Sequence, residues 1–308
     1  MNILGIETSC DDTGVAIVKD GRKVVASSLY TQKSHKDFGG VVPEIASRMH
    51  LEVLPAMTKD VIKKSGNFKI DKVAVTQTPG LSPALLVGIS FAHGLSKSLG
   101  VDLIEVNHLY AHVYANIMSF PDIIFPHISL LVSGGHTQIL KVSSPCNIEI
   151  IGTTVDDAAG EAFDKVARMF NLGFPGGPII SKLSEGRNSS YVNFPRPMIG
   201  SGDFNFSFSG LKTAVSNYKR THEVKDDLPD VLASFEESVC DILTKKTIKA
   251  AQFYGIKCIT LSGGVAANKK LRNMFLSYSG KFKIYIPPLE LCTDNAINIA
   301  AIAFEYIK

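Results

Sequence analysis

The chain has 308 residues, 45% of them hydrophobic, and its 32 basic and 29 acidic side chains leave a net charge of +3. This length and apolar content predict a well-formed core and two domains of about 150 residues each. The near-neutral charge argues against a nucleic-acid binder that relies on a concentrated basic stripe. If the protein binds RNA, the binding would therefore depend on more than charge.

Cysteine usage and the apolar runs point to a reducing compartment and no membrane span. The five cysteines are odd in number and scattered, with no CxxC pair, which argues against a disulfide framework and a zinc knuckle. The first residues lack the basic start and long apolar core of a signal peptide. No uncharged apolar run reaches about 18 residues. We therefore expect a cytoplasmic protein.

The first half of the chain predicts three consecutive strands, followed by helices that alternate with strands. Turn residues at 12–14 and 20–21 separate the first strands, as they do in hairpins. Strands that alternate with helices favour a largely parallel sheet covered on both faces. The expected elements are strands at 3–6, 15–18 and 24–26, a helix at about 47–64, a strand at 72–76, a helix capped by Ser82 and ending near residue 99, and a strand at 102–106.

The second half repeats this outline with little sequence identity. Two such units predict an α/β protein with the actin-like fold of sugar kinases and Hsp70 (ASKHA), built from two related ribonuclease-H-like domains. We expect domains at 1–125 with 292–308 and at 126–291, with a nucleotide in the cleft between them. The expected elements are strands at 128–133, 138–142 and 148–153, a helix at about 157–170, an irregular stretch at about 173–210, a helix at about 229–254, a strand at 258–262, a helix at about 267–277, a strand at 283–286 and a last helix near Asp294.

Three turns that contain glycine are candidates for binding phosphate or nucleoside. Residues 7–14 and 133–137 follow the first strand of each half, where small residues let backbone N–H groups approach a phosphate closely. The alternative for each is an ordinary hairpin turn. The third turn, at 262–268, connects a strand to a helix, so Asn268 either hydrogen-bonds a nucleoside or simply caps that helix.

Two histidines, His108 and His112, are spaced to lie on one face of a helix and to share one metal ion. Such a pair is also common in structural or exposed positions. The protease motif HExxH needs a glutamate beside the first histidine as general base, and Leu109 stands there. Asp294 is our candidate third ligand, which requires the helix that it opens to fold back toward the first domain. This ligand set leaves coordination positions open and accepts iron, zinc or manganese.

Acidic residues recur at helical spacing just after the strands of the second half. Asp157, Glu161 and Asp164 are candidates for a carboxylate that faces the cleft and accepts from ribose hydroxyls. Glu161 and Lys165 are also placed for an ordinary i,i+4 ion pair. The glycines at 173–178 either leave backbone free for close ligand contact or belong to a plain surface loop.

Seven motifs, spread in the correct order along the whole chain, resemble the TsaD family. This family is the bacterial and organellar branch of a group also represented in the archaeal and eukaryotic KEOPS complexes. Each motif is weak alone, but the ordered set is highly specific. The motifs are GIETSCDDTG at 5–14, HLYAH at 108–112, LVSGGHT at 131–137, DDAAGEAFDK at 156–165, FSGLKT at 208–213, LSGGVAAN at 261–268 and CTDNA at 292–296.

The resemblance implies transfer of threonylcarbamoyl from threonylcarbamoyl-AMP to N6 of the adenosine 3′ to the anticodon, in tRNAs that read codons starting with A. It implies one divalent metal ion, iron or zinc, held by His108, His112 and Asp294. A separate synthase would supply the donor, and a TsaB-like paralogue, a TsaE-like ATPase and tRNA would be the partners. The implied substrate and nucleotide contacts are Leu131, Val132, Ser133, Gly134, Gly135, Asp164, Gly177, Ser181 and Asn268.

Asp11 is our candidate for orienting or deprotonating the attacking amine. Three other functions compete with the transferase. A metallo-endopeptidase rests on HxxxH alone and lacks the neighbouring glutamate. A non-catalytic scaffold like TsaB would not carry the metal triad. A small-molecule kinase of the same fold would instead move phosphate from ATP.

Overall fold

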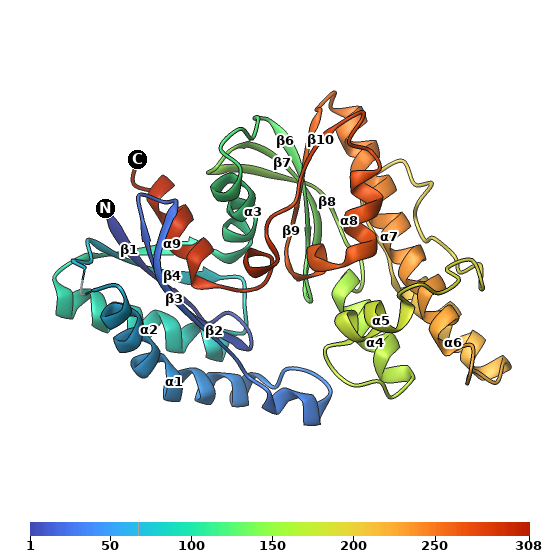
Figure 1. The fold of residues 1–308 in the computed structure, drawn as a ribbon, viewed down its shortest axis with the longest axis horizontal. Coiled ribbons are helices and arrows are strands. Elements are labelled where there is room, and N and C mark those ends of the chain that lie inside the picture. The colour runs from blue at the N-terminus through green and yellow to red at the C-terminus, as the bar shows by residue number, and fades with distance from the viewer. Residues whose placement is uncertain (67) are drawn as a thin grey trace. The chain divides into compact units, whose positions relative to one another are not determined.

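The computed structural model describes residues 1–66 and 68–308, including every side chain among them except those of residues 36 and 37. By its internal contacts the chain divides into two compact units, Met1–Asp122 with Pro287–Lys308 and Ile123–Ile286 (Figure 1). Each unit contains one five-stranded mixed sheet with helices packed on it. The predicted α/β architecture is therefore confirmed.

The sheet of the first unit has the strand order β3-β2-β1-β4-β5. The first three strands pair antiparallel, while β1, β4 and β5 run parallel. Nearly every residue of β1 and β2 is buried, because helices cover both faces, so these strands read as continuous apolar runs. The strands are β1 (Asn2–Glu7), β2 (Asp12–Lys19), β3 (Lys23–Thr31), β4 (Lys72–Thr78) and β5 (Asp102–Asn107).

Helices α1 and α2 lie on one face of this sheet, and α3 and α9 lie on the other (Figure 1). The expectation that Ser82 caps α2 was wrong: Leu81 is the N-cap residue and no side chain hydrogen-bonds there. α1 begins earlier than expected, at Pro43, because proline suits the first turn of a helix. The helices are η1 (Ser34–Phe38), α1 (Pro43–Lys64), α2 (Ser82–Leu99), α3 (His108–Ser119), η3 (Leu289–Leu291) and α9 (Ala296–Glu305).

The sheet of the second unit has the order β10-β9-β6-β7-β8 and repeats the pattern of the first. β6, β7 and β8 pair antiparallel, and β6, β9 and β10 run parallel. The predicted repeat of three strands followed by helices and further strands is thus confirmed. The strands are β6 (His127–Val132), β7 (Thr137–Ser144), β8 (Asn147–Thr153), β9 (Cys258–Ser262) and β10 (Lys283–Tyr285).

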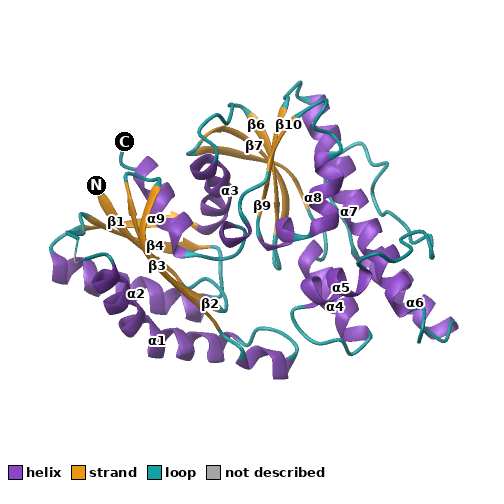
Figure 2. Cartoon of the chain, viewed as in Figure 1, coloured by secondary structure: helices purple, strands orange, loops and turns teal. Residues whose placement is uncertain are grey.

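The long helix α7 packs on β6, and α5 and α8 pack against α7. The stretch at 173–210 was expected to be irregular throughout, but it contains α5, and α6 begins within its last residues. Residues 185–208 do run as turns and loop around one isolated bridge (Figure 2). The helices are α4 (Ala159–Met169), α5 (Gly176–Ser184), α6 (Ser209–Thr221), α7 (Leu228–Phe253), η2 (Gly264–Ala267) and α8 (Lys269–Leu276).

Within the described residues, the helices are either too short or too polar to cross a membrane.

Candidate metal centre and nucleotide site

The two histidines of the HxxxH motif lie one turn apart on α3, as predicted. α3 begins at His108 directly after β5 ends, and the side chain of Asn107 caps it by accepting the N–H groups of Leu109 and Tyr110. His108 Nε2 and His112 Nε2 are 3.2 Å apart. Both side chains are buried, with 9% and 2% of their residue surfaces exposed. The two side chains are therefore buried and lie on the same face of α3.

Asp294 joins the histidine pair from the other end of the chain. Its Oδ1 lies 3.1 Å from His112 Nε2 and 3.5 Å from His108 Nε2. The last helix lies in the first unit, where α9 packs against α3. Asp294 does not open α9, however. Asn295 caps that helix by accepting the N–H of Asn298, so the Asp294 side chain is left to face the histidines.

Glycines in the first hairpin let α9 dock close to the sheet. A methyl group added at Gly5 would lie 2.5 Å from the carbonyl oxygen of Ala296 and 2.8 Å from the nitrogen of Ala300. One added at Gly14 would lie 2.8 Å from the nitrogen of Ala296. Only glycine leaves room for helix backbone at these distances. These two glycines therefore set where α9 starts, and with it the place of Asp294.

The three side chains fit one divalent ion. Ligand atoms bound about 2.0–2.2 Å from a single ion lie about 3.0–3.5 Å from one another in tetrahedral or octahedral geometry. The three separations among His108 Nε2, His112 Nε2 and Asp294 Oδ1 are 3.1, 3.2 and 3.5 Å. Nitrogen and carboxylate ligands suit iron, zinc or manganese. The residues present can therefore hold such an ion without rearrangement.

A second carboxylate, Glu7, lies behind His108, with Oε2 3.0 Å from Nδ1 of the ring. Burial alone would raise the pKa of Glu7, but the charge of His108 lowers it below its ordinary value. Burial would likewise lower the pKa of His108, but Glu7 and Asp294 raise it well above that of a free imidazole. Burial opposes ionisation of Asp294 too, and His108 lowers its pKa nonetheless. Two carboxylates thus stabilise positive charge at this site, as a bound cation requires.

Sequence reasoning did not select Glu7. The available signal was an acidic residue at the end of a strand whose other inner residues are all apolar or glycine. A buried carboxylate costs several kcal/mol unless charged or hydrogen-bonded partners accompany it, so such a residue marks a nearby partner.

The turn between β1 and β2 carries two further acids. Asp11, the candidate base, is half-buried, and its carbonyl oxygen accepts the N–H of Gln32. Asp12 was not selected from the sequence. Its Oδ1 is buried without a hydrogen-bond partner among the residues that the structure describes, and burial raises the pKa of Asp12 to about 7. Burial at this position therefore disfavours the charged form of Asp12.

We expect Asp12→Asn to stabilise the metal-free protein at alkaline pH. Asp12 stabilises the fold most below its ordinary pKa of 3.8, and this contribution is lost as pH rises to about 7. A rise of the pKa from 3.8 to about 7 corresponds to ~4 kcal/mol, of which about half should remain for a half-buried group. Urea unfolding at pH 8.5 should therefore show a gain of about 2 kcal/mol. The gain should shrink as pH falls toward 5, and a difference independent of pH would contradict this assignment.

In the second unit, the Ser133 turn joins β6 to β7. Ser133 N–H donates to the carbonyl oxygen of His136 over 2.8 Å, so the loop is built as a hairpin turn, the simpler of the two interpretations. A methyl group added at Gly134 or Gly135 would meet no atom within 4 Å. The turn does not need either glycine for its own packing. Close approach of a ligand remains a physical reason for both.

The side chains of Leu131 and Val132 are fully buried in β6. Their contribution to any bound ligand is therefore restricted to the backbone.

Three other glycines allow close packing between elements of the second unit near the end of β6. A methyl group at Gly160, in α4, would lie 2.5 Å from the carbonyl oxygen of Ser133. One at Gly263, where φ is +87°, would lie 2.4 Å from the carbonyl oxygen of Val132. One at Gly176 would lie 2.6 Å from the carbonyl oxygen of Phe163, in α4. The first two contacts bring α4 and the β9–α8 connection against the end of β6, and the third packs α5 on α4.

Asp164 lies in α4 and accepts the N–H of Gly176 over 2.7 Å, so it ties α4 to the first turn of α5. Gly177 follows, and a methyl group there would meet no atom within 4 Å. Ser181, one turn later on α5, is half-buried. The structure thus places Asp164 against the first turn of α5, Gly177 in that turn and Ser181 one turn later, on an element that the sequence analysis had taken as loop.

The other two candidate acids, Asp157 and Glu161, are held in ion pairs. Glu161 and Lys165 form the expected i,i+4 pair, with 2.7 Å between charged atoms. Lys165 also lies 2.7 Å from Asp157, and Lys212 pairs with the same carboxylate. Asp157 precedes α4, which begins at Ala159, rather than lying within the helix. These pairs support a structural interpretation of Asp157.

Asn268 caps α8 by accepting the N–H of Leu271 over 2.9 Å. Its amide nitrogen donates to the buried carboxylate of Glu236 over 2.6 Å. Within this chain the Asn268 side chain therefore caps the helix, which is the alternative interpretation of the two. Binding of a nucleoside by Asn268 stays a prediction.

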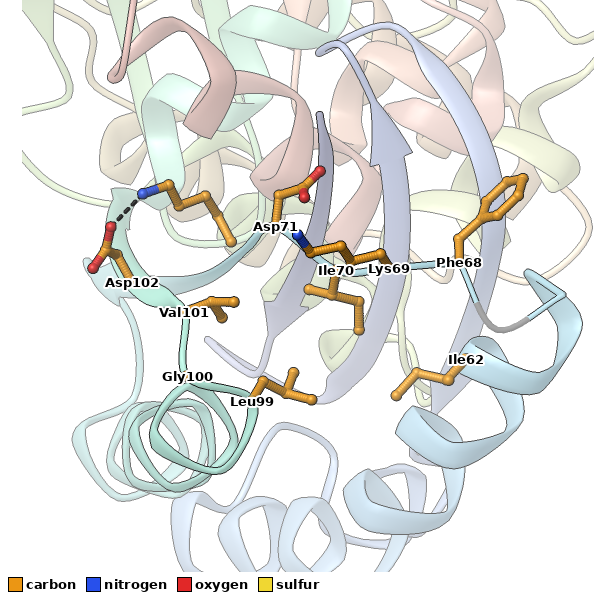
Figure 3. A pocket seen from close by; sticks show the side chains of 10 residues that line it. Ile62, Phe68, Lys69, Ile70, Asp71, Leu99, Gly100, Val101 and Asp102 are labelled. Carbon is orange, nitrogen blue, oxygen red and sulfur yellow. Dashed lines mark hydrogen bonds and ion pairs between the residues drawn. The ribbon is translucent and has the colours of Figure 1, made fainter.

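A pocket of about 560 Å³ opens in the first unit at the amino ends of β4 and β5 (Figure 3). Phe68 and Leu99 contribute apolar surface, and the Lys72–Asp102 ion pair lies among the lining residues. His108 follows the carboxyl end of β5, so this pocket and the metal residues lie at opposite edges of the sheet. Ligands of open α/β sheets bind at the carboxyl ends of the strands. We assign this pocket no part in the site.

The fold resembles those of solved structures that share little sequence with the chain. T. kodakarensis HypF superposes with a TM-score of 0.69 at 14% identity, covering 99% of this chain and 48% of that one. Component A of (R)-2-hydroxyglutaryl-CoA dehydratase from Acidaminococcus fermentans gives a TM-score of 0.60 at 16% identity, covering 99% and 98% of the two chains. These likenesses confirm the predicted ASKHA fold.

Sequence comparison identifies the family. The TsaD family, tRNA N6-adenosine threonylcarbamoyltransferase, matches residues 23–301. A protein of that name from Thermosipho africanus is 53% identical, with 100% of this chain and 95% of the relative covered. Another, from Bacillus subtilis, is 47% identical, with 99% and 91% covered. On this full-length similarity the chain belongs to the TsaD family of transferases.

Proposed function

We propose that this protein transfers threonylcarbamoyl from threonylcarbamoyl-AMP to N6 of the adenosine 3′ to the anticodon, in tRNAs that read codons starting with A. In this reaction N6 bonds to the carbamoyl carbon, and the bond from that carbon to the phosphate oxygen of AMP breaks. N6 gives up one proton. The observation that carries the proposal is the convergence of three ligand atoms on one point in a member of the TsaD family.

His108, His112 and Asp294 would hold one divalent ion, iron or zinc. When bound, the ion would polarise the carbamoyl carbonyl as a Lewis acid. The protein residues would fix its place, because His108 and His112 lie on α3 and Asp294 precedes α9, and both helices pack against the first sheet. With three protein ligands, coordination positions stay open, as in catalytic rather than structural sites.

The candidate nucleotide residues of the second unit would bind the adenylate part of the donor. Backbone N–H groups around Gly134 and Gly135 would contact the phosphate, because neither glycine is hindered by the rest of the chain. Gly177 offers the same open approach at the first turn of α5, where the helix dipole favours negative charge. Asp164, Ser181 and Asn268 would contribute further polar contacts. The nucleotide cleft between the two units stays a prediction.

Asp11 would orient the exocyclic amine or accept its proton. It lies in the same turn as Ser9, whose Oγ is 3.3 Å from His108 Nδ1, so the turn borders the proposed metal ligands. The acceptor base must leave its stack to reach such a site, which costs less in a loop than in a duplex.

The partners that we propose are tRNA, a TsaB-like paralogue and a TsaE-like ATPase, with the donor supplied by a separate synthase in the cytoplasm. The net charge of +3 is small for a protein that would hold tRNA by itself. Shared binding by partner proteins would account for this balance.

Reconstitution with threonylcarbamoyl-AMP, tRNA and the partner proteins tests the proposal directly. Nucleoside analysis of the product should find modified adenosine only when iron, zinc or manganese is supplied. Unmodified tRNA under every metal would refute the transferase assignment. A metallo-endopeptidase would instead cleave a sialoglycoprotein, which we do not expect, because Leu109 replaces the general base. A kinase would transfer the labelled γ-phosphate of ATP to a small acceptor.

Replacement of Asp11 by alanine should slow single-turnover transfer by about 100-fold, the lower end of what a general base contributes. Metal affinity should stay unchanged, because Asp11 is not one of the three ligands. Asp226→Ala, which removes an exposed acid between α6 and α7, is the matched control and should keep the wild-type rate. Wild-type transfer by Asp11→Ala would exclude Asp11 as base or orienting group.

A further inference from the structure

Glu7 is a fully buried acid whose two carboxylate oxygens are both engaged. Oε1 accepts the backbone N–H of Ser9 over 2.5 Å. Oε2 accepts the hydroxyl of Thr76, in β4, over 2.6 Å and lies 3.0 Å from Nδ1 of His108. Contacts from the β1–β2 turn, from β4 and from α3 therefore meet on one carboxylate. With so many partners, its position is fixed before any ligand binds.

The two nitrogens of His108 face different surroundings. Nδ1 faces Glu7, while Nε2 is the atom that lies 3.2 Å from His112 Nε2 and 3.5 Å from Asp294. If Nδ1–H donates to the carboxylate, the lone pair of Nε2 points at the candidate ion. A carboxylate in this place selects that tautomer and also makes Nε2 more basic.

His112 lacks such support. Its Nδ1 is buried and has no hydrogen-bond partner within the described part of the chain. Both histidines thus face Asp294 through Nε2, but only His108 also has a carboxylate at Nδ1. Glu7 therefore acts on His108 through the ring nitrogen that does not face the other candidate ligands.

We propose that Glu7 is a positioning residue of the metal centre, which fixes the tautomer and orientation of His108 and strengthens its bond to the ion. The inference rests on the proposed function insofar as it needs a metal at His108, His112 and Asp294. It goes further by giving a role to a residue that does not touch the ion. Loss of such a carboxylate partner typically lowers metal affinity by about 10- to 100-fold.

Glu7→Gln is the sharpest substitution. A carboxylate accepts hydrogen bonds at both oxygens, whereas an amide accepts at one end and donates at the other. Ser9, Thr76 and His108 all present donors, so the glutamine NH₂ must face a donor in either orientation. Glu7→Asp is a second variant, which keeps the charge but withdraws it from His108.

Zinc affinity of the full-length protein, measured by competition with a chromophoric chelator, tests the inference. Both variants should bind Zn²⁺ about 10- to 100-fold more weakly than wild type. The Co²⁺ absorption spectrum should also change, because the orientation of a ligand changes. Thr58→Val is the matched control: it removes a buried hydrogen bond to Leu54 in the same unit, away from the site. It should lower the stability and leave both metal readouts as in wild type.

The outcomes separate the two proposals. Suppose that Glu7→Gln and Glu7→Asp fold, bind Zn²⁺ as tightly as Thr58→Val does and keep the wild-type Co²⁺ spectrum. Glu7 would then have only a structural role, and this inference would be overturned while the metal assignment stands. Wild-type protein that binds neither Zn²⁺ nor Co²⁺ would overturn the metal assignment, and the role of Glu7 with it. A selective loss of affinity in the Glu7 variants supports both.

Discussion

Replacement of His112 by alanine should weaken binding of a divalent ion by at least about 100-fold and abolish threonylcarbamoyl transfer. Loss of a carboxylate behind a ligand costs 10- to 100-fold in affinity, so loss of a ligand itself should cost no less. His112 Nε2 is central to the cluster, at 3.2 Å from His108 Nε2 and 3.1 Å from Asp294 Oδ1. The two remaining ligands would be left with most of the coordination shell open.

Chelator competition with Zn²⁺ and single-turnover transfer measure the two effects on the same preparations. His93→Ala is the matched control, because His93 lies exposed on α2 and is not part of the triad. It should bind metal and transfer the group as wild type does. Transfer by His112→Ala at the wild-type rate would remove the metal centre from the reaction. Tight binding by the variant would place the ion elsewhere.

Parts of this centre could be predicted because they depend on local spacing. Positions i and i+4 of one helix share a face whatever the fold, so His108 and His112 needed only a helix between them. The place of Asp294 is a long-range property, and it became predictable only through the need for a third ligand and through the CTDNA motif. Glu7 escaped prediction, because its contacts join residues 69 and 101 positions apart. No local pattern encodes such pairings.

The fold was predictable where hydrophobic periodicity is clear, and α5 shows where it is not. Gly176, Gly177 and Pro178 lower the helix propensity of its first turn, so the sequence favoured a loop. In the structure proline costs little there, since the first N–H groups of a helix have no partner in any case. Gly176 is needed because the turn approaches the backbone of α4. A tertiary contact with α4 therefore stabilises α5 as a helix, although its local sequence favours a loop.

The glycines of the seven motifs divide into two groups that look alike in sequence. Some are required by the chain itself, since any side chain would collide with backbone, as at Gly5 and Gly160. Others, such as Gly134 and Gly135, have open space where a side chain would lie. Gly134 and Gly135 are among the residues that the family resemblance assigns to the nucleotide, whereas Gly264 is open but is not one of them. Packing explains the first group, and ligand approach is our explanation for the second.

The second large effect that we expect concerns a glycine that packing requires. Gly5→Ala should destabilise the protein and weaken metal binding. The new methyl group would lie 2.5 Å from the carbonyl oxygen of Ala296 and 2.9 Å from Cβ of Ala300. Helix backbone cannot turn aside as a flexible side chain can, so α9 must shift. Overpacking of this kind costs about 2–3 kcal/mol in the free energy of unfolding. Asp294 lies two residues before α9 and should move with it.

Urea unfolding of the metal-free protein isolates the packing cost, because bound metal would add its own stabilisation. Zinc affinity, measured next, should fall about 10-fold through the displaced carboxylate. Gly94→Ala is the matched control: Gly94 is exposed inside α2, and a methyl group there meets no atom within 4 Å. It should raise stability by about 0.5–1 kcal/mol, since alanine favours helix over glycine. If Gly5→Ala lost stability but kept its affinity, Asp294 would be held by its own turn rather than by α9.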